Sequence, residues 1–261
     1  MKKIIMYVVL AMILVGCKLD PKPVGNEGSY QSVSFDLVCA SEINILPISI
    51  NGATAPKEPF DFSIAKLKKY TTNNVIVHKN VELTLNESDI NHFIHDFGVS
   101  NNLNILPEAQ KELLREKLNT LPQNSTTIVM IYTPILHFTR STEGRSLRGI
   151  AFGKRADQPL NVVAYNKVNI DGAPVITKNQ AWKIVLTHEF GHRLGVPANI
   201  SHNKAKHCTS RECIMYSSPD WQSVVSVLLL NGMPYDFCDL CEAELKDMKE
   251  NCFIPNTPSI I

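Results

Sequence analysis

Two histidines and a glutamate form an HExxH run in the second half of the chain. His188 and His192 are four residues apart, slightly more than one helical turn, so a helix would project both imidazoles from one face. Two such imidazoles can bind one metal ion. Glu189 would lie about 100° around the helix from His188, beside the metal rather than on it. A carboxylate in that place can take a proton from metal-bound water, so the run predicts a hydrolytic metal site.

Further residues with metal chemistry follow the run. Gly195 can end the helix in a left-handed turn that sends the chain back toward the metal, and Pro197 prevents the helix from continuing. The residues that come next are His207, Cys208, Cys213, Met215, Cys238 and Cys241. The Cx4C and CxxC spacings suit four thiolates around a tetrahedral zinc ion. Two disulfides are the alternative, because the N-terminal residues described below predict export to an oxidising compartment.

This order of residues resembles the metzincin zinc peptidases, whose motif is HExxHxxGxxH followed by a methionine in a tight turn under the metal. It is more closely similar to the archaemetzincins, in which the motif continues as HCx4CxM and then CxxC. Here His207 and Cys208 are followed by four residues, Cys213 and Met215, and later by Cys238 and Cys241. The resemblance covers residues 43–255, and its specific part is 188–241.

The resemblance implies two zinc ions per chain and a peptide or protein substrate. His188, His192 and His207 would hold a catalytic zinc, and Glu189 would deprotonate its bound water for attack on a peptide carbonyl. Met215 would form the hydrophobic base beneath that metal. A second, structural zinc would be held by the four cysteines Cys208, Cys213, Cys238 and Cys241.

The third histidine departs from the family pattern. The family places it three residues after the glycine, where this chain has Ala198, and His207 comes nine residues later. His202 lies inside this insertion and is the competing ligand. We predict His207, because it directly precedes Cys208 and so ties the two metal sites together.

Two other functions compete with the metzincin reading. A gluzincin-type peptidase would take its third ligand from a downstream glutamate such as Glu242 or Glu244. A non-catalytic envelope lipoprotein could instead retain zinc only for stability. His92 and His95 are three residues apart with no evident third ligand, so we interpret them as ordinary histidines.

The elements that must position these residues are strands and helices of one domain, residues 32–261. We expect an α+β, metzincin-like fold, with a twisted mixed β-sheet packed on helices, an HExxH active-site helix and a zinc-stapled C-terminal subdomain. The active-site helix is predicted from a cap at Asn179 to Leu194. The strand at Leu147–Gly153 is the expected sheet edge, to which an extended peptide could add. Strands are predicted at Val33–Cys39, Ile43–Ile50, Asn74–Leu83, Thr127–Thr133 and Asn161–Tyr165, and helices at Asp61–Tyr70, from Asn86 to Gly98 and at Pro107–Leu118.

The N-terminus predicts export and a lipid anchor. Lys2 and Lys3 precede a short apolar run, Ile4–Val15, that suits a secretory signal. Its end, with Gly16 before Cys17, resembles the lipobox of bacterial lipoproteins. Residues 1–16 would be the signal peptide, and residues 17–31 the lipidated Cys17 and a flexible spacer. The protein would then be tethered to a bacterial envelope membrane. The alternative is a plain signal peptide that happens to contain a cysteine.

Composition limits the remaining classes of function. The 261 residues are 44% hydrophobic and 20% charged, which is ordinary for a globular domain. Without residues 1–16 the chain has 24 basic and 25 acidic residues, so nothing points to nucleic acid. We expect a monomer. Cys39 and Cys252 remain outside the motif and could be bridged or free.

Overall fold

The computed structural model describes residues 37–122, 126–135, 149–152, 160–166, 177–204, 206–216 and 235–253. The predicted signal peptide, Cys17 and spacer lie outside these residues. The strands are β1 (Ile43–Ile50), β2 (Val75–Val77), β3 (Val81–Leu83), β4 (Thr127–Tyr132), β5 (Gly149–Ala151), β6 (Asn161–Tyr165), β7 (Asn203–Lys204) and β8 (His207–Cys208). The helices are α3 (Lys57–Tyr70), α4 (Glu87–Ser100), α5 (Glu108–Asn119), α6 (Lys178–Leu194), α8 (Asp239–Glu250) and the 3-10 turn η1 (Asn251–Phe253).

The main sheet is mixed, as predicted. Strand β1 runs parallel to β2, β3 and β4, and β4 runs parallel to β6, whereas β5 is antiparallel to β6. The order along the sheet is β2-β1-β4-β6-β5, with β3 also paired to β1. Strand β5 is therefore the edge on the β6 side of the described sheet, where the sequence predicted an edge.

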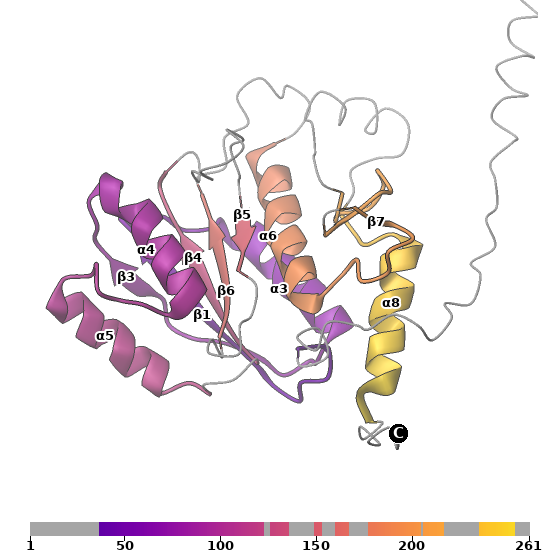
Figure 1. Cartoon of the computed structure of the whole chain (residues 1–261), viewed down its shortest axis with the longest axis horizontal. Helices are drawn as coiled ribbons and strands as arrows, with labels where there is room; N and C mark the ends of the chain where they lie inside the picture. The colour runs from indigo at the N-terminus through magenta and orange to yellow at the C-terminus, as the bar shows by residue number, and fades with distance from the viewer. Residues whose placement is uncertain are drawn as a thin grey trace, which may run out of the picture.

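Helices cover both faces of the sheet (Figure 1). Alternating side chains of the buried strands point to opposite faces, so Ile128 and Met130 of β4 join one core whereas Val129 and Ile131 join the other. The first core includes residues of α3, α6 and α8, and the second includes residues of α4 and α5. The site helix α6 thus packs directly on the sheet, next to α3.

The cap of α6 differs from the prediction. Thr177, not Asn179, is the N-cap: its hydroxyl accepts a hydrogen bond from Gln180 N at 3.2 Å, and Thr177 N donates to Gln180 Oε1 at 2.7 Å. This reciprocal capping box satisfies two backbone donors that Asn179 alone could not. Asn179 instead donates to Glu58 of α3 at 2.9 Å. The C-terminal end at Leu194 agrees with the prediction.

Three other elements also differ. Helix α4 continues past Gly98 and ends before Asn101, which adopts the left-handed conformation that asparagine tolerates. The strand predicted at Asn74–Leu83 is two short strands, β2 and β3, that pair with successive parts of β1. Leu37 and Val38, at the end of the predicted strand Val33–Cys39, are helical.

A disulfide joins the two ends of the described chain. Cys39 and Cys252 are bonded across a sequence separation of 213 residues, with their Cα atoms 5.2 Å apart. The sequence had left this pair undecided. Because Cys252 lies in η1, directly after α8, the disulfide holds the C-terminal helix against the start of the domain.

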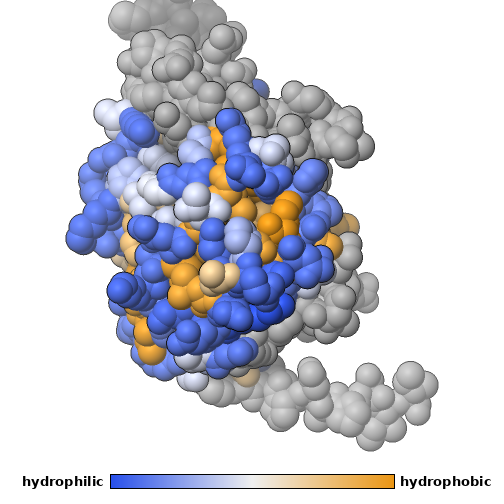
Figure 2. Space-filling model, turned by 90° about the vertical axis from the view of Figure 1, so that its left-hand side faces the viewer, coloured by the Kyte–Doolittle hydropathy of each residue, from blue (hydrophilic) through white to orange (hydrophobic). Residues whose placement is uncertain are grey.

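The outer face of the α4 and α5 layer is mostly hydrophilic, with apolar areas between polar side chains (Figure 2). Leu113 of α5 is 43% exposed, and both predicted ordinary histidines, His92 and His95, are exposed on α4. None of the described helices is both long and apolar enough to cross a bilayer.

Candidate metal centre

Three histidines converge at the C-terminal half of α6. His188 and His192 project from the same side of the helix, with ring centroids 4.8 Å apart, and His207 lies 5.2 and 4.9 Å from them. One nitrogen from each ring lies within 4.8 Å of the others. Three imidazoles that face one another this closely are a donor set suited to zinc, which binds histidine nitrogen at about 2.0–2.1 Å.

The chain between α6 and His207 explains how a late histidine reaches the helix. Gly195, at φ 83°, ends α6 in the left-handed turn that the sequence predicted. Asn203 then donates to the Pro197 carbonyl at 2.6 Å, which closes a short loop. Next β7 and β8 form an antiparallel hairpin in which Lys204 pairs with His207. The described part of the insertion thus ends in β7, whose pairing with β8 places His207 beside the histidine helix.

A backbone carbonyl orients the first histidine. His188 Nδ1 lies 2.7 Å from the Ile214 carbonyl oxygen, which can only accept, so Nδ1 carries the proton and Nε2 is left as the metal-binding atom. Burial lowers the pKa of His188 to about 4, against the raising effect of this hydrogen bond. Burial also lowers the pKa of His192 well below 6.5. Both rings are therefore neutral at pH 7, the form that binds a metal ion.

Met215 lies under the same turn of α6. It is fully buried, and a Cβ added to Gly191 would overlap its Sδ atom. Gly191 stands between Glu189 and His192, so the methionine occupies the space that the glycine leaves beneath the turn that carries the two histidines. The role of Met215 as the base beneath a metal ion stays a prediction.

Glu189 is buried beside the histidines. It is 5% exposed, and its Oε2 has no hydrogen-bond partner within the described residues. Burial raises its pKa to about 8, although the nearby charge of Arg193 lowers it. Gly149 of the edge strand β5 lies against this carboxylate: a Cβ there would be 2.5 Å from Glu189 Oε1. A carboxyl group that exchanges its proton near neutral pH thus lies next to the sheet edge.

Arg193 ties the site helix to the edge strand. It is 7% exposed, and its Nη1 donates to the carbonyl of Phe152, directly after β5. Burial lowers the pKa of Arg193 to about 10, opposed by the charge of Glu189. Gly149, Gly191 and Arg193 were not identified from the sequence. The only sequence signal was the location of Gly191 within the HExxH run and of Gly149 within the predicted edge strand.

The four motif cysteines form a second cluster. Their sulfur atoms all lie within 4.8 Å of one another. The Cys208 and Cys238 sulfurs are 3.6 Å apart, as are those of Cys213 and Cys241, and all four are free thiols. A disulfide needs about 2.05 Å, whereas four sulfurs around zinc lie about 3.8 Å apart, given Zn–S bonds of about 2.3 Å. The cluster fits zinc and not disulfides.

The competing ligand His202 belongs neither to the group of three histidines nor to the group of four cysteines. Its Nε2 is 3.0 Å from Glu244 Oε1, and its Nδ1 is 3.5 Å from Cys208 Sγ. The hydrogen bond with Glu244 raises the pKa of His202 above 6.5. The structure therefore brings His207, rather than His202, to His188 and His192.

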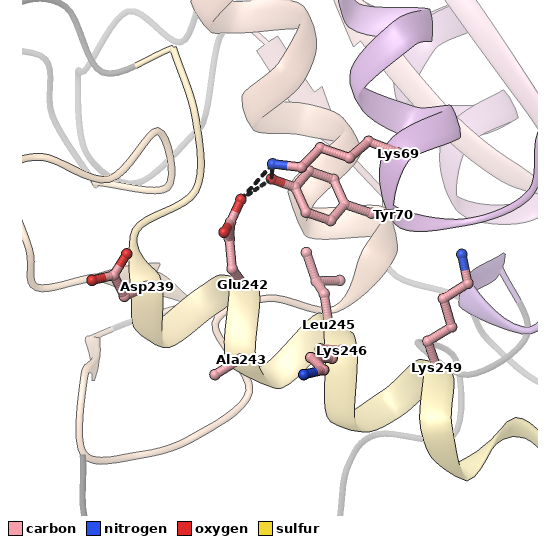
Figure 3. A pocket seen from close by; sticks show the side chains of 8 residues that line it. All are labelled: Lys69, Tyr70, Asp239, Glu242, Ala243, Leu245, Lys246 and Lys249. Carbon is pink, nitrogen blue, oxygen red and sulfur yellow. Dashed lines mark hydrogen bonds and ion pairs between the residues drawn. The ribbon is translucent and has the colours of Figure 1, made fainter.

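The glutamates of the gluzincin alternative point elsewhere. Glu242 bonds to Lys69 Nζ at 2.6 Å and to the Tyr70 hydroxyl, at a cavity of about 410 Å³ between α3 and α8 (Figure 3). Glu244 bonds to the backbone of Ala198 and Asn199. Neither carboxylate belongs to the histidine group found among the described residues.

No family model matches the sequence, and no curated protein matches it. Among solved structures, the chain is similar to an archaemetzincin from Methanopyrus kandleri, with 17% identity and a TM-score of 0.47, over 81% of this chain and 97% of that one. An archaemetzincin from Archaeoglobus fulgidus, crystallised with malonate, matches at 16% identity and a TM-score of 0.36, over 77% and 99%. These superpositions are loose, so the function proposed below rests on the residues of this chain.

Proposed function

We propose that this protein is a zinc-dependent peptidase with the site organisation of an archaemetzincin. The observation that carries the proposal is the convergence of three imidazoles, with one nitrogen of each within 4.8 Å of the others, beside a buried glutamate that forms no hydrogen bond with the described residues through Oε2. His188, His192 and His207 would hold the zinc ion. When bound, such an ion acidifies water and polarises a carbonyl group.

Glu189 acts as the general base in this proposal. Its pKa of about 8 lets the carboxylate exchange a proton near neutral pH, taking it from the attacking water and passing it to the leaving amine. Gly149 and Arg193 hold it in place: the glycine leaves room for the carboxylate, and the arginine fixes the helix against the strand.

The substrate in this proposal is an extended peptide that pairs with β5. This strand ends the described sheet, and its Gly149 contacts Glu189. Backbone hydrogen bonds to an edge strand hold a peptide without reading its sequence, so the scissile bond would be placed by main-chain pairing.

A second zinc is proposed at Cys208, Cys213, Cys238 and Cys241. It joins the segment that carries His207 and Met215 to the start of α8, where Cys238 is the N-cap. Its task is structural, because four thiolates complete a tetrahedral shell and leave no position for substrate. With it, the C-terminal part of the domain becomes the zinc-stapled subdomain.

We also propose that Cys17 is lipidated after removal of residues 1–16 and anchors the protein in a bacterial envelope membrane. The Cys39–Cys252 disulfide supports an exported location, because such bonds persist in oxidising compartments. Replacing Cys17 with Ser should abolish labelling by radioactive fatty acid in growing cells. Labelling that persists would contradict the anchor.

The deciding experiment for the peptidase is Glu189→Gln, with Glu116→Gln on the distant helix α5 as the matched control. Loss of the base should lower cleavage of a peptide library by about 10²–10⁴-fold while the zinc content stays near two per chain. The control should behave as the wild type. Equal cleavage by both variants would exclude the mechanism. Zinc-loaded wild type that cleaves no member of the library would favour the non-catalytic lipoprotein instead.

A further inference from the structure

The inserted loop, which the structure describes at residues 198–204 and 206, is held by one buried carboxylate. Glu244 of α8 is 3% exposed. Its Oε2 accepts a hydrogen bond from Ala198 N at 2.9 Å, and its Oε1 accepts one from Asn199 N at 2.6 Å. Oε1 also bonds to His202 Nε2 at 3.0 Å. Every hydrogen bond described for this carboxylate therefore goes to the inserted loop.

These bonds fix the loop strongly. A carboxylate this deeply buried is costly unless it is hydrogen-bonded, so the folded state strongly favours the loop conformation that supplies the three donors. Hydrogen bonds to a charged acceptor are also about twice as strong as those between neutral groups. Glu244 thus anchors both the beginning and the middle of the loop to α8.

His202 carries this anchor to the cysteine cluster. Its Nδ1 contacts Cys208 Sγ at 3.5 Å, and its carbonyl accepts from Thr209 N at 2.9 Å. The adjacent Asn203 pairs with Cys208 in the β7–β8 hairpin. A carboxylate behind a histidine is a common support for metal ligands, and here the histidine reaches a sulfur ligand of the proposed zinc.

His202, Cys241 and Glu244 could also be read as a third metal site, because one donor atom from each lies within 4.8 Å of the others. The hydrogen bonds argue against it. Both carboxylate oxygens bond to backbone N–H groups of the loop, and both ring nitrogens of His202 already have partners. A metal ion would have to displace several of these bonds.

We propose that Glu244 and His202 are positioning residues that lock the inserted loop onto α8 and hold Cys208, and with it the adjacent His207, in place for the two metal ions. This inference rests on the cysteine-held zinc of the proposed function. It assigns a purpose to His202 and to the insertion, neither of which binds the histidine-held metal.

The test uses the full chain with two variants and one control. In Glu244→Gln, the amide has a single acceptor oxygen for the three donors, so the anchor is broken. His202→Gln keeps a donor for Glu244 but removes the ring nitrogen at Cys208, so the loop stays anchored and the variant is expected to fold. Glu242→Gln is the control, because Glu242 lies on the same helix with a similar number of bonds but faces Lys69 and Tyr70.

Two readouts follow the cysteine-held metal separately from activity. They are the thiolate-to-cobalt absorption band of the cobalt-loaded protein and the rate of zinc release to a chromogenic chelator. Both Glu244→Gln and His202→Gln should weaken retention of the thiolate-held metal by about 10–100-fold, the usual effect of removing a group that supports a ligand. Glu242→Gln should release it at the wild-type rate.

The outcomes separate the inference from the function on which it rests. Wild-type protein without the thiolate band would overturn the cysteine-held zinc and this inference together. A wild-type band with unchanged release from both variants would overturn the inference alone. Loss of a third metal ion from Glu244→Gln, with the thiolate band intact, would overturn the inference in favour of a metal site formed by His202, Cys241 and Glu244.

Discussion

The Met215 side chain fills the space where Gly191 lacks a Cβ, directly beneath the helical turn that carries His188 and His192. The methionine is fully buried and cannot swing into solvent. The ring of Phe237 closes the same space, since it would lie 2.9 Å from an added Cβ. The turn that presents His188 and His192 thus rests on a close contact between the helix backbone and one side chain.

Gly191→Ala should therefore destabilise the protein, even though alanine favours a helix interior by about 1 kcal/mol over glycine. The inserted methyl group overpacks the contact with Met215, at a cost of about 1–3 kcal/mol. Urea unfolding at pH 7 measures the net change. We expect loss of the histidine-held metal to accompany it, because the turn must move.

A double-mutant cycle provides the control for this contact. Met215→Ala alone opens a cavity at a cost of about 2–5 kcal/mol. Combined with Gly191→Ala, part of that cavity is filled, so the double variant should be more stable than the sum of the two changes predicts. Simple additivity would show that the two residues do not share this space.

Gly149→Ala should impair catalysis rather than folding. An added Cβ would lie 2.5 Å from Glu189 Oε1 and 2.8 Å from its carboxyl carbon, so the carboxylate must shift. Displacement of a catalytic group by about 1 Å can cost 10²-fold in rate. We expect kcat to fall to that extent while the zinc content is unchanged.

Ile150→Ala is the matched control for this change. Ile150 lies on the same strand but packs against the opposite core, away from Glu189. It should lower thermal stability without a comparable loss of kcat. If the two variants lose activity equally, the effect comes from the strand and not from the position of the carboxylate.

The sequence predicted that His188 and His192 share one side of a helix because their arrangement is local. His188, Glu189 and His192 follow from one helical repeat, and Gly195 ends that helix in the expected conformation. We predicted His207 as the third histidine because it directly precedes Cys208 in the sequence. The relations within α6 depend on a few bonds along the chain, whereas the return of His207 also depends on the pairing of β7 with β8.

The supporting contacts could not be predicted, because they join distant segments. Gly149 meets Glu189 across 40 residues, and Glu244 meets His202 across 42. Only the packing of the edge strand β5 against α6, and of α8 against α3 and the loop after α6, brings such pairs together. The cap at Thr177 was missed for a different reason: Asn179 is also a good cap, and the reciprocal bond with Gln180 decides between them.

Tyr165→Phe should reduce the decrease in the free energy of unfolding at alkaline pH. Burial raises the pKa of Tyr165 well above 10, with a smaller contribution from the charge of Tyr132. Because the folded state keeps this proton when the unfolded chain loses it near pH 10, stability is fully present below that pH and falls as the pH rises above it. The phenylalanine variant lacks this proton and should lose less stability between pH 9 and 11.

Measurement at pH 7 serves as the internal reference for Tyr165→Phe. The hydroxyl has no hydrogen-bond partner within the described residues, so its removal should cost little there. Thermal unfolding at both pH values gives the comparison. An equal alkaline loss in both proteins would show that Tyr165 ionises in the folded state.

Removing the metal should expose four thiols and no more, in lipidated protein or in protein with Cys17 blocked. Cys208, Cys213, Cys238 and Cys241 are free but gathered around one point, so bound zinc should shield them from a thiol reagent. Cys39 and Cys252 are oxidised and cannot react. Titration of the native protein should find almost no reactive thiol, and titration after chelation in denaturant should find about four, with about two zinc ions released. Four thiols that react without chelation would contradict a cysteine-held zinc, and six after chelation would contradict the disulfide.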